Sequence, residues 1–132
     1  MELRYLYVGS SDIERDVAAW LEVPGAQMQW RFRHFGADVA AITVGPPPTL
    51  LLADHRPPGS VLPIYAVNDL DAAVAELSTD GWTVDVESVE TPEGPAAVVH
   101  TASGTEVALL QVVRPGAMER AYAARDNTHA VR

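Results

Sequence analysis

With 132 residues, 48% of them hydrophobic, the chain is long enough for one domain with a sizeable core. Its formal net charge of −9 argues against a nucleic-acid partner, which needs a basic surface, and favours neutral or cationic ligands. All nine basic residues are arginines and cysteine is absent, so lysine Schiff-base chemistry, disulfides and thiolate sites are excluded. No apolar run approaches the roughly 18 residues of a membrane span, and no signal-peptide pattern opens the chain, so we expect a cytoplasmic protein without a membrane partner.

The first half of the sequence predicts a strand, a short helix and three further strands. Residues 3–8 are strand-like, and Ser11 with Glu14 forms a capping box that starts a helix ending near Leu21. The helical spacing of its apolar residues predicts one buried face, made of Ile13, Val17, Trp20 and Leu21. Alternation and turn residues then predict three strands, at 28–35, 39–44 and 49–54.

The second half repeats this pattern. A strand at 62–67 and a helix at 69–78 are followed by strands at 82–89, 96–100 and 105–113. The tail predicts a short helix at 117–125 and then a polar end that frays. At an offset of 57 positions, Asp12 aligns with Asp69 and Val17 with Val74. The sequence therefore predicts an α+β fold of two tandem βαβββ modules, 1–57 and 58–114, followed by a C-terminal helix and tail at 115–132.

Two segments of the second module carry a family resemblance. The corner Val67–Val74 and the last hairpin, Ser103–Gln111, resemble the corresponding segments of the vicinal oxygen chelate superfamily. That superfamily includes glyoxalase I, extradiol dioxygenases, fosfomycin-resistance enzymes and bleomycin-resistance proteins. The resemblance covers residues 3–113 and implies a ligand cleft of the glyoxalase/bleomycin-resistance type between curved mixed sheets.

Enzymes of this superfamily hold a divalent metal with histidine and glutamate side chains. The matching positions of this chain are Tyr5, Leu62, Ala108 and Leu50 or Leu52, which offer neither imidazole nor carboxylate. Asp54 and Glu106 lie near two of these positions, but two carboxylates without a placed histidine make a poor site. We therefore expect no metal, no cofactor and no catalytic residue, as in the metal-free bleomycin-resistance-like branch.

The cleft positions implied by the resemblance are aromatic and apolar, with a few polar tips. Because side chains alternate along strands, Tyr5 and Tyr7 point the same way, and Trp30 shares a face with Phe32. We expect Tyr5 and Trp30 to contact ligand and to meet water on their outer side. The full predicted ligand-binding set is Tyr5, Tyr7, Trp30, Phe32, His34, Leu50, Leu52, Leu62, Ile64, Glu106, Ala108 and Leu110.

Three functions fit these observations. The first is a metal-free binding protein, similar to antibiotic-resistance proteins, that sequesters an aromatic or cationic compound through aromatic stacking and carboxylates. The second is an enzyme, either metal-dependent with ligands in another register or metal-free with Tyr5, His34 or Glu106 as acid or base. The third is a regulatory interaction module.

We also expect a homodimer, because Met118, Ala121 and Tyr122 form an apolar stripe at helical spacing in the tail.

Overall fold

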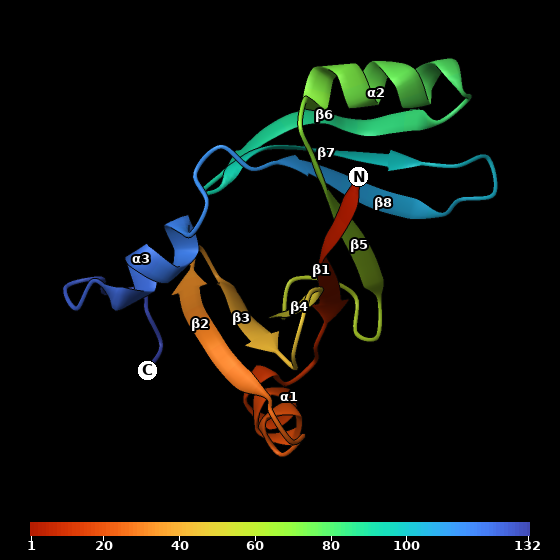
Figure 1. Ribbon diagram of the computed structural model, residues 1–132. Coiled ribbons are helices and arrows are strands. Elements are labelled where there is room, and N and C mark those ends of the chain that lie inside the picture. Colours follow the sequence, from red (N-terminus) through yellow and green to blue (C-terminus); the bar gives the residue numbers. More distant parts are fainter. The chain divides into compact units, whose positions relative to one another are not determined.

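Two βαβββ modules account for the eight strands and first two helices of the computed structural model, which describes all 132 residues (Figure 1). The first module, apart from the first residues of its first strand, lies within one compact unit, residues Tyr5–Val61 with Met118–Arg132, which we call the α1 unit. The second unit, Met1–Arg4 with Leu62–Ala117, is the α2 unit. The first four residues of the chain thus belong to the α2 unit, and the tail belongs to the α1 unit.

The first module contains α1 (Ile13–Leu21) and four strands, β1 (Glu2–Gly9), β2 (Gln27–His34), β3 (Ala37–Thr43) and β4 (Thr49–Ala53). The strands lie side by side in the order β2-β3-β4-β1. β1 and β4 are parallel, and the other two pairs are antiparallel.

The second module has the same plan. It contains α2 (Leu70–Thr79) and four strands, β5 (Val61–Val67), β6 (Thr83–Thr91), β7 (Gly94–His100) and β8 (Glu106–Gln111). The order is β5-β8-β7-β6, again with one parallel pair, β5 and β8. The predicted α+β fold of two βαβββ modules is therefore confirmed. A third helix, α3 (Ala117–Ala123), leads into the tail, and none of the three helices is long and apolar enough to cross a membrane.

The two module helices start at equivalent aspartates. The Asp12 carboxylate accepts a hydrogen bond from the Arg15 N–H at 3.1 Å, and the Asp69 carboxylate accepts one from the Ala72 N–H at 3.0 Å. Asp12, rather than the expected Ser11, is thus the N-cap of α1. An aspartate suits this position because its side chain satisfies a backbone N–H that the first helical turn leaves without a partner.

Each helix packs an apolar face on its own sheet. In the α1 unit, Ile13 and Val17 contact a buried cluster on β3 and β4, made of Ala40, Ile42 and Leu52. The prediction of a wider buried face is wrong, because Trp20 and Leu21 are 37% and 42% exposed. In the α2 unit, the corresponding buried cluster is Leu70, Ala97 and Leu109.

The tail is held to the edge of β2 instead of fraying. The Arg33 N–H donates to the His129 carbonyl at 2.8 Å, and the Val131 N–H donates to the Arg31 carbonyl at 2.9 Å. These bonds satisfy backbone groups that an edge strand leaves open. The Tyr122 ring of α3 also packs edge-on against Phe32, with ring centroids 5.6 Å apart. The tail is therefore part of the α1 unit.

Candidate functional site

Strand register decides which side chains share the face of the α1 unit that is turned away from α1. Tyr7 pairs with Leu51, Leu51 with Ala41, and Ala41 with Trp30. Because residues that pair across strands lie on the same face, and so do residues two apart along a strand, Tyr5 and Phe32 belong to this face too. The structure thus brings together four of the predicted ligand-binding aromatics, Tyr5, Tyr7, Trp30 and Phe32.

Two predicted site residues of β4 lie on the opposite face. Leu52 belongs to the buried cluster under α1, and Leu50 packs against that cluster. Their predicted place beside the aromatic residues is therefore wrong, and Leu51, which pairs with Tyr7, occupies it. A run of three leucines gives no alternation from which the face could be predicted.

Most of the aromatic face is buried. Tyr5 and Trp30 are only 7% and 5% exposed, so the expectation that their outer sides meet water is wrong. Phe32 is half-buried between the Trp30 ring, at a centroid distance of 5.7 Å, and Tyr122. Because Tyr5 and Trp30 pack as core residues, they offer a ligand little surface.

On this face, Tyr7 carries a hydroxyl group that contacts other titratable side chains. Its hydroxyl shares a 2.9 Å hydrogen bond with His55 Nε2, and the Arg56 guanidinium lies 5.7 Å from the centre of its ring. Burial raises the pKa of the Tyr7 hydroxyl above its ordinary value; the positive charge of Arg56 opposes this shift, and Asp54 adds to it. The hydroxyl therefore stays protonated at neutral pH and can donate.

The segment that carries His55 and Arg56 folds back along β1. The Gly9 N–H donates to the Ser60 carbonyl at 2.9 Å, and the Gly9 carbonyl accepts from the Gly59 N–H at 3.1 Å. His55 is absent from the ligand-binding set predicted from the sequence. One signal in the sequence could have indicated its position. His55 follows β4, and because β4 runs parallel to β1, the residues after β4 lie near the C-terminal end of β1.

Gly9 is needed for this close approach. A Cβ atom built on Gly9 would lie 1.9 Å from the Pro57 carbonyl oxygen and 2.9 Å from Ser60 Oγ. We expect Gly9→Ala to lower the free energy of unfolding by about 1–3 kcal/mol, as overpacking against backbone does. The variant should also move His55 off Tyr7. Urea unfolding, together with the His55 ring resonances in NMR spectra, measures both effects, and wild-type values for both would contradict this packing.

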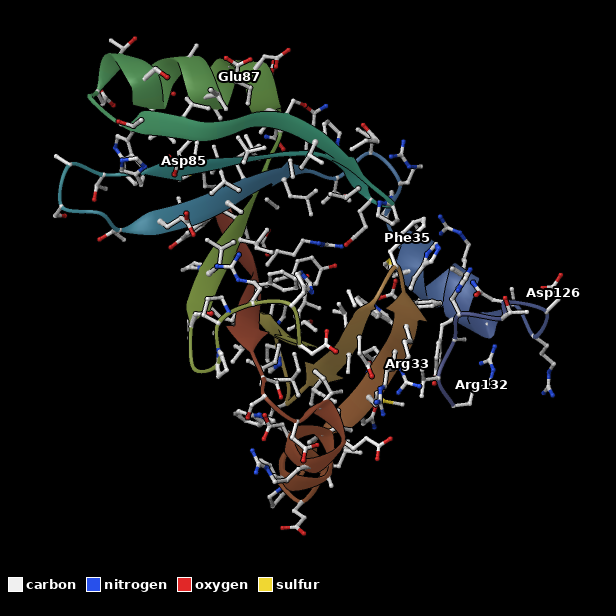
Figure 2. The ribbon with its side chains drawn as sticks, turned by 180° about the vertical axis from the view of Figure 1, so that it is seen from behind. Arg33, Phe35, Asp85, Glu87, Asp126 and Arg132 are labelled. Carbon is white, nitrogen blue, oxygen red and sulfur yellow. The ribbon has the colours of Figure 1, made fainter.

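His34 lies two positions after Phe32 in unbroken register, so it belongs to the aromatic face at the end of β2. Its exposed ring is stacked between Phe35, at a centroid distance of 3.9 Å, and His129 of the tail, at 3.8 Å. Phe35 occupies the following turn (Figure 2). The imidazole is therefore part of the contact between β2 and the tail.

The five predicted site residues of the α2 unit share one face, opposite α2. Ile64 pairs with Ala108, and alternation adds Leu62, Leu110 and Glu106 to that face. Leu62, Ala108 and Leu110 are buried, and Glu106 is exposed at the start of β8.

Beside Glu106, the imidazole of His100 is oriented by a carboxylate. Glu106 pairs with His100, whose Nδ1 lies 2.8 Å from both carboxylate oxygens of Asp85. Asp85 lies in a β-bulge between Val84 and Val86. A bulge changes the direction of a side chain, and this allows the Asp85 carboxylate to reach His100.

The residues at the expected metal-ligand positions do not fit a metal. Leu62 and Ala108 carry no donor atom, and Tyr5 offers a single phenol oxygen in a side chain that is 7% exposed. Nowhere in the 132 residues do three or more histidine, aspartate or glutamate side chains gather closely enough to hold an ion.

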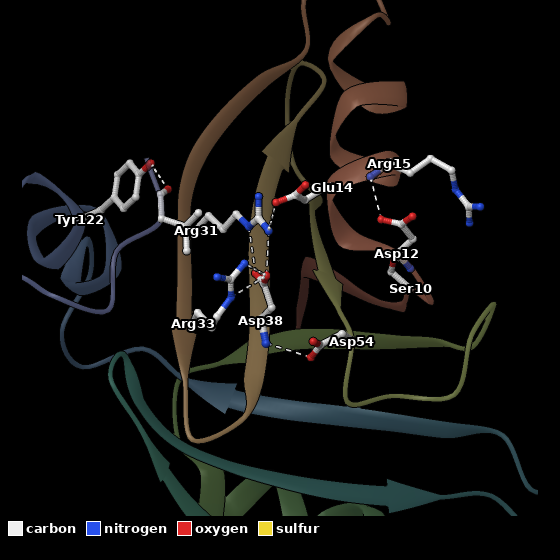
Figure 3. A network of polar contacts seen from close by, with 10 residues as sticks. Ser10, Asp12, Glu14, Arg15, Arg31, Arg33, Asp38, Asp54 and Tyr122 are labelled. Atoms are coloured by element: carbon white, nitrogen blue, oxygen red, sulfur yellow. Dashed lines mark hydrogen bonds and ion pairs between the residues drawn. The ribbon is translucent and has the colours of Figure 1, made fainter.

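The opposite face of the α1 unit holds a buried ion network (Figure 3). Asp38 receives two hydrogen bonds from Arg31, at 2.9 and 2.8 Å, and two weaker ones from Arg33, at 3.3 and 3.1 Å. The hydrogen bond from Arg31 holds the pKa of Asp38 below its ordinary value, although burial alone would raise it. The Asp38 N–H donates to the Asp54 carboxylate at 2.9 Å. This network thus links β3 to the segment that carries His55.

A separate hollow of about 370 Å³ lies in the α2 unit, at the carboxyl ends of β5 and β8. Its wall contains Arg4, whose guanidinium donates to the buried Glu93 carboxylate at 2.6 Å. None of the predicted site residues lines it; the lining residues are Met1, Glu2, Arg4, Ala66, Val67, Asn68 and Val112.

Comparison with solved structures shows the fold. A hypothetical protein of Bacillus halodurans matches with a TM-score of 0.74 at 11% identity, over 86% of this chain and 95% of that one. Methylmalonyl-CoA epimerase of Mycobacterium tuberculosis matches with a TM-score of 0.73 at 15% identity, over 86% and 89% of the two chains. The chain has the vicinal oxygen chelate fold.

A further match to this fold is a variant of the Streptomyces coelicolor methylmalonyl-CoA epimerase in complex with 2-nitronate-propionyl-CoA. Its TM-score is 0.72 at 13% identity, over 86% of this chain and 99% of that one. No protein-family model matches the sequence, and no curated protein matches it. Identities this low carry the fold but not the activity.

Proposed function

We propose that this vicinal oxygen chelate protein binds and sequesters a small aromatic compound without a metal, and that the ligand contacts Tyr7, His55 and Arg56. The observation that carries the proposal is the 2.9 Å contact between the Tyr7 hydroxyl and His55 Nε2, with Arg56 beside the same ring. Aromatic surface with a few convergent polar groups is typical of small-molecule sites. Leucine and alanine at two of the positions where the superfamily's enzymes carry metal ligands favour binding over metal-dependent turnover.

The side chains around Tyr7 favour a ligand with a negatively charged or acceptor group. The Tyr7 hydroxyl and the Arg56 guanidinium are hydrogen-bond donors, and the guanidinium can pair with a carboxylate. A cationic ligand would instead need carboxylates such as Glu106, which lies at the exposed end of β8. Of the two ligand classes expected from the sequence, an aromatic compound is thus better supported than a cationic one.

Two matched probes test this choice: 2-naphthoate and 2-naphthylmethylammonium. We expect 2-naphthoate to bind the wild-type protein, and Tyr7→Phe and Arg56→Gln each to raise its Kd about tenfold, because each removes a hydrogen bond to a charged group. Isothermal titration calorimetry gives the dissociation constants. The control variant Glu106→Gln should leave 2-naphthoate binding unchanged. Tighter binding of the ammonium compound, weakened by Glu106→Gln, would contradict the proposal and restore the cationic alternative.

An enzyme remains the second candidate, because Tyr7 and His55 are a hydrogen-bonded pair of groups that can exchange protons. Metal content separates a metal-dependent enzyme from the proposed binding protein. We expect elemental analysis of the purified protein to find no stoichiometric Zn, Ni, Mn or Fe, because Leu62 and Ala108 cannot ligate a cation. About one tightly held ion per chain would favour the metal-dependent enzyme.

A further inference from the structure

The tail meets β2 through two stacked imidazole rings. His34, the last residue of β2, and His129 of the tail lie face to face, with ring centroids 3.8 Å apart and ring planes 17° from parallel. Both side chains are exposed. Histidine is the side chain whose ordinary change of charge falls between pH 5 and 8. The contact between β2 and the tail therefore contains two groups that can both become positively charged in mild acid.

The residue after His34 supports this stack from the other side. The Phe35 ring lies 3.9 Å from the His34 ring between centroids, with the planes 16° from parallel. Phe35 is 95% exposed and has a φ of 50°, a backbone conformation that is uncommon for a bulky residue. Such strain clusters at functional sites. The stack gives this side chain a role, because it holds the His34 ring parallel to that of His129.

The charged groups of β2 and the tail do not favour a second positive charge at this stack. Residues 27–34 and 118–132 together hold five of the nine arginines, and their acidic residues are Glu119 and Asp126. Asp126 lies at the outer tip of the tail, away from Phe35 (Figure 2). Glu119 belongs to α3, near the start of the tail. Two imidazolium groups would therefore lie in surroundings that are already positive.

The neighbouring strand β3 offers no free carboxylate either. Ala37 of β3 pairs with His34, and the residue after Ala37 is Asp38. The Asp38 carboxylate is already hydrogen-bonded to Arg31 and Arg33. The stack thus differs from the imidazole of His100, which has its own carboxylate partner.

Few other bonds hold the end of the tail on β2. Two backbone hydrogen bonds cross the contact, one from the Arg33 N–H to the His129 carbonyl and one from the Val131 N–H to the Arg31 carbonyl. The helix that leads into the tail, α3, has only seven residues, and a helix this short depends on its tertiary contacts. Repulsion between two charges about 4 Å apart is large enough to compete with bonds of this number.

We propose that the stack of His34 on His129 is a pH-sensitive latch, which holds the tail on β2 when both imidazoles are neutral and releases it when both are protonated. Release opens the backbone edge of β2. It also removes the Val131 carbonyl from the Tyr122 hydroxyl, which donates to it at 2.8 Å. Because the Tyr122 ring packs on Phe32, aromatic surface of the α1 unit becomes accessible in mild acid. The latch does not depend on ligand binding at Tyr7.

Amide hydrogen exchange of the wild-type protein measures the latch directly. The Arg33 and Val131 N–H groups report on the contact, and the Leu70 N–H, which donates to Gln111 Oε1 in the α2 unit, is the internal control. Protection factors correct for the intrinsic effect of pH on exchange. We expect those of Arg33 and Val131 to fall at least tenfold from about pH 7.5 to about pH 5, and that of Leu70 to change less than twofold.

His129→Phe tests whether charge on both rings is what releases the tail. The phenyl ring keeps the stack and cannot be protonated, and a charged His34 is then attracted to it. Protection of Val131 in this variant should therefore be the same at both pH values. The matched control His100→Gln removes an imidazole outside the tail contact and should keep the wild-type fall. Unchanged protection of Val131 in the wild type, an equal fall in His129→Phe, or an equal fall at Leu70 would each overturn the proposal.

Discussion

Asp38→Ala should lower the free energy of unfolding by about 3–5 kcal/mol at neutral pH, because it leaves the Arg31 guanidinium buried without its carboxylate. Both side chains are less than a tenth exposed, and Asp38 receives two hydrogen bonds from Arg31. Breaking one partner of a buried pair is costly, whereas replacing both by apolar groups is often tolerated. The double variant Arg31→Met with Asp38→Ala should therefore recover a large part of the loss in urea unfolding.

The effect of Asp38 should depend on pH. Because Arg31 lowers the pKa of Asp38 in the folded state, the stabilisation is present above the unfolded value of about 3.9 and is lost as the pH falls through the lower folded value. The difference between wild type and Asp38→Ala should thus be largest near pH 7 and shrink steadily below about pH 4. A difference that does not change with pH would contradict the ion-pair account.

Trp30→Ala should be comparably damaging, with a loss of about 3–5 kcal/mol, because the indole is 5% exposed and is removed from a packed face. The matched control is Trp20→Ala: Trp20 is 37% exposed on α1, and its loss should cost about 1 kcal/mol or less. Urea unfolding of both variants measures the contrast. Equal, small losses would mean that Trp30 is a ligand-facing residue, as the sequence alone suggested.

Local patterns predicted the elements of this fold well, because they depend on signals that neighbouring residues carry. Alternation along β1 and β2 is such a signal, and it placed Tyr5 with Tyr7 and Trp30 with Phe32 correctly. That the two pairs share one face was implied by the family resemblance. Burial of Tyr5 and Trp30 could not be predicted in this way, since it depends on what packs against them.

The errors in the site have similar physical causes. The faces of Leu50 and Leu52 depend on the register between β4 and its neighbours, and three successive leucines give no alternation. His55 contacts Tyr7 across 48 positions of sequence, through a segment whose path depends on the approach of Pro57 to Gly9. The pairing of the tail with β2 spans a still longer stretch of sequence, so neither contact could be predicted from spacing.

The most direct test of the proposed site is a titration of ¹⁵N-labelled protein with 2-naphthoate, followed by two-dimensional NMR. We expect the largest saturable chemical-shift changes at Tyr7, His55 and Arg56, and we expect them to disappear in the double variant Tyr7→Phe with Arg56→Gln. The proposed site would be contradicted if the largest shift changes appeared around Arg4 and Asn68, at the hollow of the α2 unit. It would also be contradicted if the double variant showed the same shift changes as the wild type.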